Sequence, residues 1–141
     1  TLKTVGSKLK QYKVDYTYQY EFAKYASENG VSLYSLVSST GANSKSFFFY
    51  PKIKGQLEDS VKKLPFKTIH IFQPPILIRQ AELIRRGEKF AIKIFSSLNN
   101  LGILKSHKPI PVSTLANRMV DEIKNFQQIK FKTISPRDFK S

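Results

Sequence analysis

Residues 31–72 read VSLYSLVSSTGANSKSFFFYPKIKGQLEDSVKKLPFKTIHIF, and this stretch decides the fold class. It opens with Val31–Val37, a short run rich in strand-forming residues that predicts a buried strand. Apolar residues then recur at helical spacing from about Phe49 to Leu64, with Pro51 in the first turn, where a missing backbone N–H does no harm. Lys67–Phe72 alternates like a second strand and stops at a proline pair. The stretch therefore predicts a strand–helix–strand unit.

The flanking sequence continues this alternation. A helix is expected over Val14–Asn29, with Gly30 as its C-cap, because glycine tolerates a positive φ. Two further helical patterns follow the second strand, at Gly87–Leu98 and Ser113–Phe126, and Ile129–Ile134 reads as a last strand. This order predicts an α/β domain whose three strands share one sheet, the first two in parallel. One face of the first helix carries Tyr18, Phe22 and Tyr25, with Ala23 and Ala26 beside them.

Composition restricts the possible chemistry. A chain of 141 residues with 40% apolar and 13% aromatic residues fits one domain with a core and argues against disorder. No uncharged apolar stretch reaches the roughly 18 residues of a transmembrane segment. The absence of cysteine excludes disulfides, thiolate metal sites and cysteine nucleophiles, and with only His70 and His107 we expect no metal centre. A chain without disulfides suits a reducing compartment, so we expect a cytoplasmic protein.

The net charge of +14 raises the question of a nucleic-acid partner. Lysines and arginines are spread along the whole chain and mixed with acidic residues, and the densest spots are only Lys62–Lys63 and Arg85–Arg86. Such a spread is typical of a solvated surface and argues against nucleic-acid binding. A basic face that meets an anionic ligand or a larger assembly explains the charge equally well.

The loop and helix in the middle of the quoted stretch predict a proton-transfer site. Tyr50 and Lys54 are four residues apart, so on a helix they face the same side. A phenol titrates at about 10, and a nearby cation lowers that pKa by favouring the phenolate. Ser39 ends a strand at the sheet edge where ligands bind, and its hydroxyl could hold a carbonyl while Tyr50 transfers the proton. The alternative is a structural helix start, because Tyr-x-x-x-Lys arises easily by chance among seven tyrosines and many lysines.

Three segments together resemble a known family. They are VDYTYQYEFAKYASENGVSLYSLVSSTGANSKSFFFYPKIKGQLEDSVKKLPFKTIHIFQPPIL (14–77), RRGEKFAIKIF (85–95) and KPIPVSTLANRMV (108–120). They resemble the carboxyl half of an atypical short-chain dehydrogenase/reductase, most closely the Tat-interacting-protein branch of small NADPH-binding oxidoreductases. The opening TLKTVGSKLKQYKVDY resembles the loop and helix after the fourth strand of that fold. The resemblance thus covers nearly the whole chain.

The resemblance implies the carboxyl-terminal half of a doubly wound parallel Rossmann-type sheet. It implies an NAD(P)H-dependent oxidoreductase of the carbonyl reductase/dehydrogenase type, with a small carbonyl substrate, NADP(H) in preference to NAD(H), and no metal. Ser39, or alternatively Ser38, would orient the carbonyl, Tyr50 would act as acid/base, and Lys54 would lower the tyrosine pKa and bind the nicotinamide ribose. The cofactor-binding residues would be Ser38, Lys54, Gln73, Pro74, Pro75 and Ile76.

The chain departs from the family pattern in two ways. Gln73-Pro74-Pro75 stands where the family usually has Arg-Pro-Gly, which removes a charged donor and fixes one φ near −65°. The amino-terminal half, with the Gly-rich turn that holds the pyrophosphate at a helix N-terminus, is not present. We therefore expect residues 1–141 to form a single incomplete NAD(P)-binding Rossmann-like domain. The start at Thr1 fits this expectation.

Two partner hypotheses follow from the missing half. Without it the first strand exposes a sheet edge, which the amino-terminal half of the same fold or another chain would cover. Alternatively, the chain is a non-catalytic basic interaction subunit or scaffold that keeps the reductase fold, within a larger or nucleic-acid-associated assembly.

Overall fold

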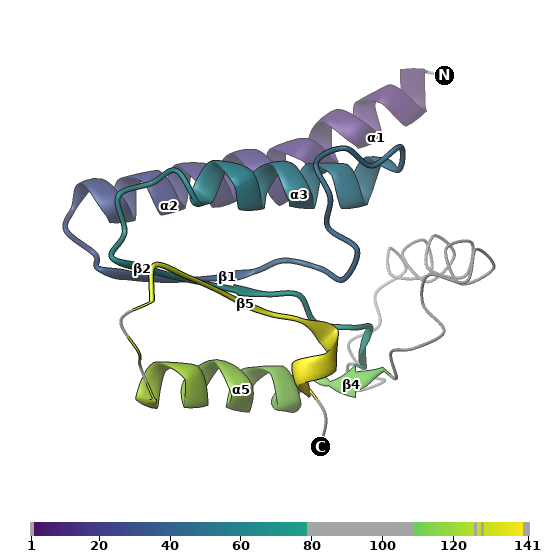
Figure 1. Ribbon diagram of the computed structural model, residues 1–141. Coiled ribbons are helices and arrows are strands. Elements are labelled where there is room, and N and C mark those ends of the chain that lie inside the picture. Colours follow the sequence, from purple (N-terminus) through teal and green to yellow (C-terminus); the bar gives the residue numbers. More distant parts are fainter. Residues whose placement is uncertain (1, 79–108, 126, 128, 140–141) are drawn as a thin grey trace.

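The computed structural model describes residues 2–78, 109–125, 127 and 129–139 (Figure 1). The helix expected over Gly87–Leu98 and the Arg85–Arg86 pair lie outside these residues. A sheet of three strands is the centre of the described chain: β1 (Leu33–Val37), β2 (Thr68–Phe72) and β5 (Phe131–Ile134), in the order β1-β2-β5.

All three strands run in parallel. The β1–β2 register runs from Leu33 opposite Thr68 to Val37 opposite Phe72, and β5 pairs with the other edge of β2. The predicted parallel pairing of the first two strands is confirmed. All five residues of β2 are buried, as expected for a central parallel strand covered on both faces.

Helices cover both faces of the sheet (Figure 1). On one side lie α3 (Phe49–Val61) and a continuous helical rod made of α1 (Leu2–Tyr12), η1 (Lys13–Thr17) and α2 (Tyr18–Glu28). On the other side lies α5 (Val112–Lys124). The segment η1 is a single π-helical turn, a distortion of α-helices that is frequent at functional sites. The described residues therefore form an α/β sandwich with crossover helices.

Two apolar cores fill the layers. Alternate side chains of β2 point to opposite faces of the sheet, so Ile69 and Ile71 enter one core and Phe72 enters the other. The first core, beneath the helices α2 and α3, contains Ala23, Leu36, Leu57, Val61, Phe66, Ile69 and Ile71. The second, toward α5, contains Phe72, Leu115, Ile134 and Phe139.

Two short elements were not expected from the sequence. The two-residue strands β3 (Leu77–Ile78) and β4 (Ile110–Pro111) pair in parallel just before α5. A 3₁₀ turn, η3 (Pro136–Phe139), follows β5 and buries Phe139 in the second core.

The aromatic face of the first predicted helix points to solvent. Tyr18, Phe22 and Tyr25 are between 55% and 68% exposed, whereas Ala23 is the buried residue of α2. Together with the exposed Val14 they form a row at helical spacing, called the apolar stripe below. Phe22 also contacts Tyr34 of β1, with ring centroids 6.5 Å apart. The stripe therefore continues to β1, which pairs only with β2 among the described strands.

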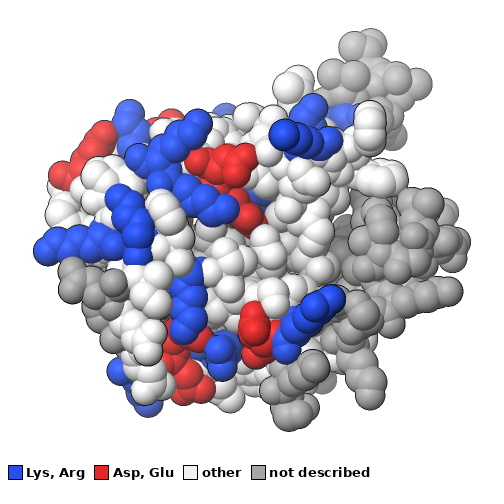
Figure 2. Space-filling view, viewed as in Figure 1, with Lys and Arg blue, Asp and Glu red and all other residues white. Residues whose placement is uncertain are grey.

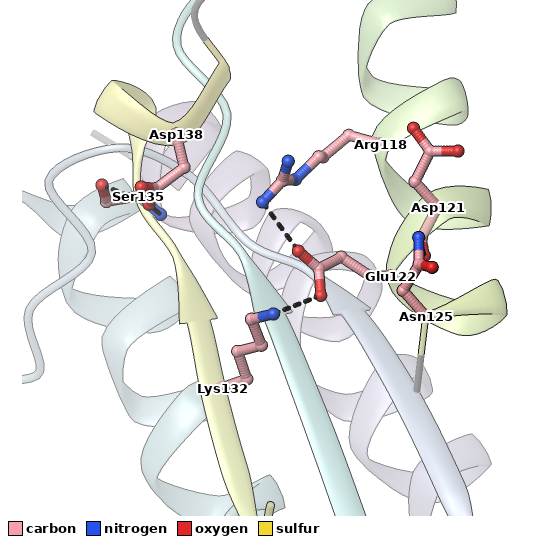
Figure 3. Close-up of polar contacts among 7 residues, drawn as sticks. All are labelled: Arg118, Asp121, Glu122, Asn125, Lys132, Ser135 and Asp138. Atoms are coloured by element: carbon pink, nitrogen blue, oxygen red, sulfur yellow. Dashed lines mark hydrogen bonds and ion pairs between the residues drawn. The ribbon is translucent and has the colours of Figure 1, made fainter. Parts of the chain in front are cut away.

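A buried carboxylate holds α5 against the sheet (Figure 3). Glu122 accepts a hydrogen bond from Lys132 of β5 at 2.6 Å and forms an ion pair with Arg118 of α5 at 2.7 Å. Burial alone raises the pKa of Glu122, but the Lys132 hydrogen bond and the charges of Lys132 and Arg118 outweigh it and hold the pKa below its ordinary value. The ionised Glu122 therefore stabilises the fold.

We expect Glu122→Gln to lower the free energy of unfolding by about 1–2 kcal/mol at neutral pH, a figure reduced for the partial exposure of its two partners. Because the folded pKa is lowered, this stabilisation is present above the ordinary pKa of glutamate and is lost as the pH falls through the folded pKa. Urea unfolding of the wild type and the variant over an acidic pH series measures the difference. The neighbouring exposed Asp121→Asn is the control, and a pH-independent difference would contradict the assignment.

The loop after β1 lies directly against α3. A Cβ atom at Gly55 would overlap the backbone of Asn43 and Ser44. The Asn43 N–H also donates to the Pro51 carbonyl at 3.0 Å. This close approach needs a residue without a side chain, and it holds the segment after Ser39 against the helix that carries Tyr50.

Gly55→Ala is expected to cost about 2 kcal/mol or more, because its methyl group would meet backbone that cannot rotate away. Nothing lies within 4 Å of the corresponding position at Gly6 in α1. Gly6→Ala should therefore leave stability unchanged or raise it by roughly 0.5–1 kcal/mol. Urea midpoints of the two variants make the comparison, and equal midpoints would show that the loop is not packed on Gly55.

Candidate active site

The carboxyl ends of β1 and β2 are joined by backbone hydrogen bonds. Ser38 N–H donates to the Phe72 carbonyl at 2.7 Å, and Thr40 N–H donates to the Pro74 carbonyl at 3.2 Å. Both Ser38 and Ser39 are buried. The structure thus places the predicted serine pair beside the segment after β2.

The segment 73–76 is held from several sides. Gln73 N–H donates to the Ile134 carbonyl of β5, and the Ile76 carbonyl accepts from Ile110 N–H of β4, both at 2.9 Å. Pro74 and Pro75 are buried. The backbone that the resemblance assigns to the cofactor is therefore a fixed part of the sheet edge.

Lys54 joins three elements at this edge. Its side chain projects from α3, and the residue is only 3% exposed. The ammonium Nζ donates to the Val37 carbonyl of β1 at 3.1 Å and to Gln19 Oε1 of α2 at 3.4 Å. The predicted placement of Lys54 on α3, facing the end of β1, is what the structure shows.

Tyr50 lies in the first turn of α3, close to the strand end that carries Ser39. Burial raises the pKa of Tyr50, and the negative charge of Asp15 raises it further. The nearby Ser39 side chain acts in the opposite direction and lowers the pKa, but less strongly. Ser39 Oγ also reaches its neighbour's carbonyl, Thr40 O, at 3.3 Å. The structure thus brings Ser39, Tyr50 and Lys54 to one place.

The direction of the Tyr50 pKa differs from the prediction. The sequence predicted a lowered pKa because of the Lys54 cation, whereas the pKa lies above its ordinary value. The physical reason is that desolvation of the phenolate and the charge of Asp15 dominate in the folded chain. Tyr50 therefore keeps its proton at neutral pH.

Burial lowers the pKa of Lys54, while the negative charges of Asp15 and Glu58 raise it and partly offset the burial. These two acids were missed in the sequence reasoning, as was Gln19. Glu58 could have been found, because it lies four residues after Lys54 on the same helical face. Asp15 and Gln19 could not, because their approach to α3 depends on how the helical rod packs.

Glu58 connects the site to the segment after β2. It is 6% exposed, and both of its carboxylate oxygens accept from Gln73 Nε2, at 3.0 and 3.2 Å. The amide nitrogen of Gln73 is thus engaged with α3. Among the described residues, no group of acidic or histidine side chains is arranged to hold a metal ion. None of the described helices combines the length and apolar character that crossing a membrane requires.

Comparison with known proteins places the chain among a set of relatives. No family model matches it. It is 39% identical over 97 residues to "Protein fmp52, mitochondrial" of Aspergillus clavatus, covering 64% of this chain and 42% of that protein. It is 35% identical over 122 residues to "Protein FMP52, mitochondrial" of Lodderomyces elongisporus, covering 86% and 51%. It is 32% identical over 111 residues to "Protein HTATIP2" of Rattus norvegicus, covering 79% and 45%.

The chain is a relative of the Fmp52 proteins and of HTATIP2. The relationship to HTATIP2 agrees with the resemblance to the Tat-interacting-protein branch that the sequence shows. The chain spans about half the length of the curated relatives it matches. The two fungal names include the word mitochondrial, whereas the sequence predicted a cytoplasmic protein.

The buried ammonium of Lys54 predicts an effect on stability at alkaline pH. Because its folded pKa is lowered, the unfolded chain binds this proton more tightly, and burial of the charge opposes folding at neutral pH. This penalty is relieved as the pH rises through the folded pKa toward the ordinary lysine value. Urea unfolding over that range should show the wild type gaining stability relative to Lys54→Met. Exposed Lys52→Met is the control on the same helix, and parallel curves for Lys54→Met and the wild type would contradict the prediction.

Proposed function

We propose that this chain carries the acid/base part of an NAD(P)H-dependent oxidoreductase of the carbonyl reductase/dehydrogenase type, acting on a small carbonyl substrate. One observation carries the proposal. The buried Lys54 ammonium donates to the Val37 carbonyl at the carboxyl end of parallel strand β1, and Ser39, buried just after that strand, lies near enough to Tyr50 to lower its pKa; ligands bind at this end of the strands in open α/β sheets. The resemblance and the relationship to HTATIP2 support it.

Each residue of the site has a distinct proposed role. Ser39 orients the substrate carbonyl by donating a hydrogen bond to its oxygen. The protonated phenol of Tyr50 transfers its proton to that oxygen, and Lys54 stabilises the resulting phenolate. A bound reduced nicotinamide supplies the hydride that the carbonyl carbon accepts. The raised pKa of Tyr50 keeps the phenol protonated before the reaction, as this role as a proton donor requires.

The proposed cofactor contacts are Ser38, Lys54 and the segment Gln73–Pro74–Pro75–Ile76. We propose NADP(H) in preference to NAD(H), with a pyrophosphate site supplied by the amino-terminal half of the fold or by another chain. Two observations support such a partner. The outer edge of β1 has no neighbouring strand among the described residues, and the apolar stripe beside it is exposed. A strand and helix that pack there would bury both features. The names of the fungal relatives favour a mitochondrial location over the predicted cytoplasmic one.

The second candidate is a non-catalytic interaction subunit that keeps the reductase fold. The engagement of Gln73 with Glu58, which occupies its amide nitrogen, and the apolar stripe favour it. A nucleic-acid-associated role has less support. Figure 2 shows Lys and Arg side chains interspersed with Asp and Glu on the visible face, rather than gathered in one basic patch.

The test is NADPH consumption by the natural full-length protein with a panel of aliphatic and aromatic aldehydes and ketones. Turnover is expected with at least one of them, and Tyr50→Phe should reduce it by about a hundredfold or more, because the proton donor is removed. Exposed Tyr25→Phe is the matched control and should keep full turnover. Retained turnover in Tyr50→Phe would exclude the assigned site. Bound NADPH without turnover of any carbonyl would favour the non-catalytic candidate.

A further inference from the structure

Glu58 is buried next to the proposed site with a partner that does not neutralise it. An ionised carboxylate removed from water needs hydrogen bonds or an opposite charge. Both carboxylate oxygens of Glu58 accept a hydrogen bond from Gln73 Nε2, at 3.0 and 3.2 Å. An amide satisfies hydrogen bonds but carries no charge. The negative charge of Glu58 therefore remains available to another group.

Lys54 is the cation placed to use that charge. Residues four apart on a helix have Cβ atoms about 5–6 Å apart, so Lys54 and Glu58 are neighbours on the buried face of α3. The groups that act on the Lys54 ammonium from the surrounding elements are Asp15 of η1, Gln19 of α2, Glu58 of α3 and the Val37 carbonyl of β1. Of these groups, Asp15 and Glu58 are the acidic side chains.

We propose that Glu58 and Gln73 are a positioning pair, in which Glu58 is a counter-charge for the buried Lys54 ammonium and Gln73 ties that carboxylate to the segment after β2. Gln73 holds the Glu58 carboxylate by hydrogen bonds and, being uncharged, does not neutralise it. The pair links α3, which carries Tyr50 and Lys54, to the backbone 73–76 that we assign to the cofactor. The effect of Glu58 on the Lys54 ammonium does not depend on the proposed function. Only the importance of this effect for catalysis rests on it.

The residue type at position 73 makes the proposal specific. An arginine at position 73 would form a charge-assisted pair with Glu58 and cancel its charge. Lys54 would then keep only Asp15 as an acidic neighbour. The chain with Gln73 instead leaves two acids to balance one buried ammonium.

The decisive variants are Gln73→Arg, which keeps the contact but cancels the charge, and Glu58→Gln, which removes the charge and leaves an amide in its place. In both, the Lys54 titration midpoint should move to lower pH, measured by NMR of the side-chain nitrogen in lysine-labelled protein. Asp59→Asn removes the same charge from an exposed position next to Glu58 and should leave the midpoint unchanged. Amide spectra verify that each variant is folded, and Gln73→Arg carries the test if Glu58→Gln does not fold.

An unchanged Lys54 midpoint in folded Gln73→Arg and Glu58→Gln would overturn the proposal. So would an equal shift in Asp59→Asn, which would reveal a general surface effect. The outcome is separable from that of the proposed function because the NMR readout needs no turnover. If the Lys54 midpoint shifts in these variants while Tyr50→Phe keeps full activity, the positioning pair is retained and the reductase site is rejected. If the midpoint does not shift while Tyr50→Phe loses activity, the reductase site is retained and the pair is rejected.

Discussion

The hydrogen bond from the buried Lys54 ammonium to the Val37 carbonyl is the interaction on which the arrangement of this site depends. This bond fixes α3 over the carboxyl end of β1. A second hydrogen bond, from the same ammonium to Gln19 of α2, holds the helical rod against α3. A charged group without water must find such partners, so its position tolerates little change. Tyr50 and Glu58, one turn before and one turn after Lys54 on the same helix, are placed by the same contact.

The electrostatics of the site follow from burial more than from pairing. Desolvation raises the pKa of Tyr50 and lowers the pKa of Lys54, so it disfavours the charged form of each. Asp15 acts on both groups in the same sense, since a nearby negative charge favours protonation of both. A protonated phenol beside a protonated ammonium suits proton donation to a substrate oxygen.

The outer surface of the described chain has two different characters. Toward α5, the carboxylate of Glu122 is paired with Arg118 and Lys132. Toward the outer edge of β1, aromatic side chains of the apolar stripe are exposed beside a strand with an open side. Exposed apolar surface next to unpaired strand groups is unfavourable in water and a ready site for association.

The local sequence determined the strands and the helix within residues 31–72. Strand alternation, helical spacing and the positions of Gly and Pro at the ends of elements all act within a few residues. The local sequence also determined that Tyr50 and Lys54 share a helical face, a consequence of helix geometry alone. Tertiary structure decided that Tyr18 and its neighbours face solvent while Ala23 is buried, since a helical pattern does not say which face meets the sheet. It also decided the direction of the Tyr50 pKa and the contact between Glu58 and Gln73. Burial and charge at these positions come from residues far apart in the chain, which only the packing of α3, η1 and the end of β2 brings together.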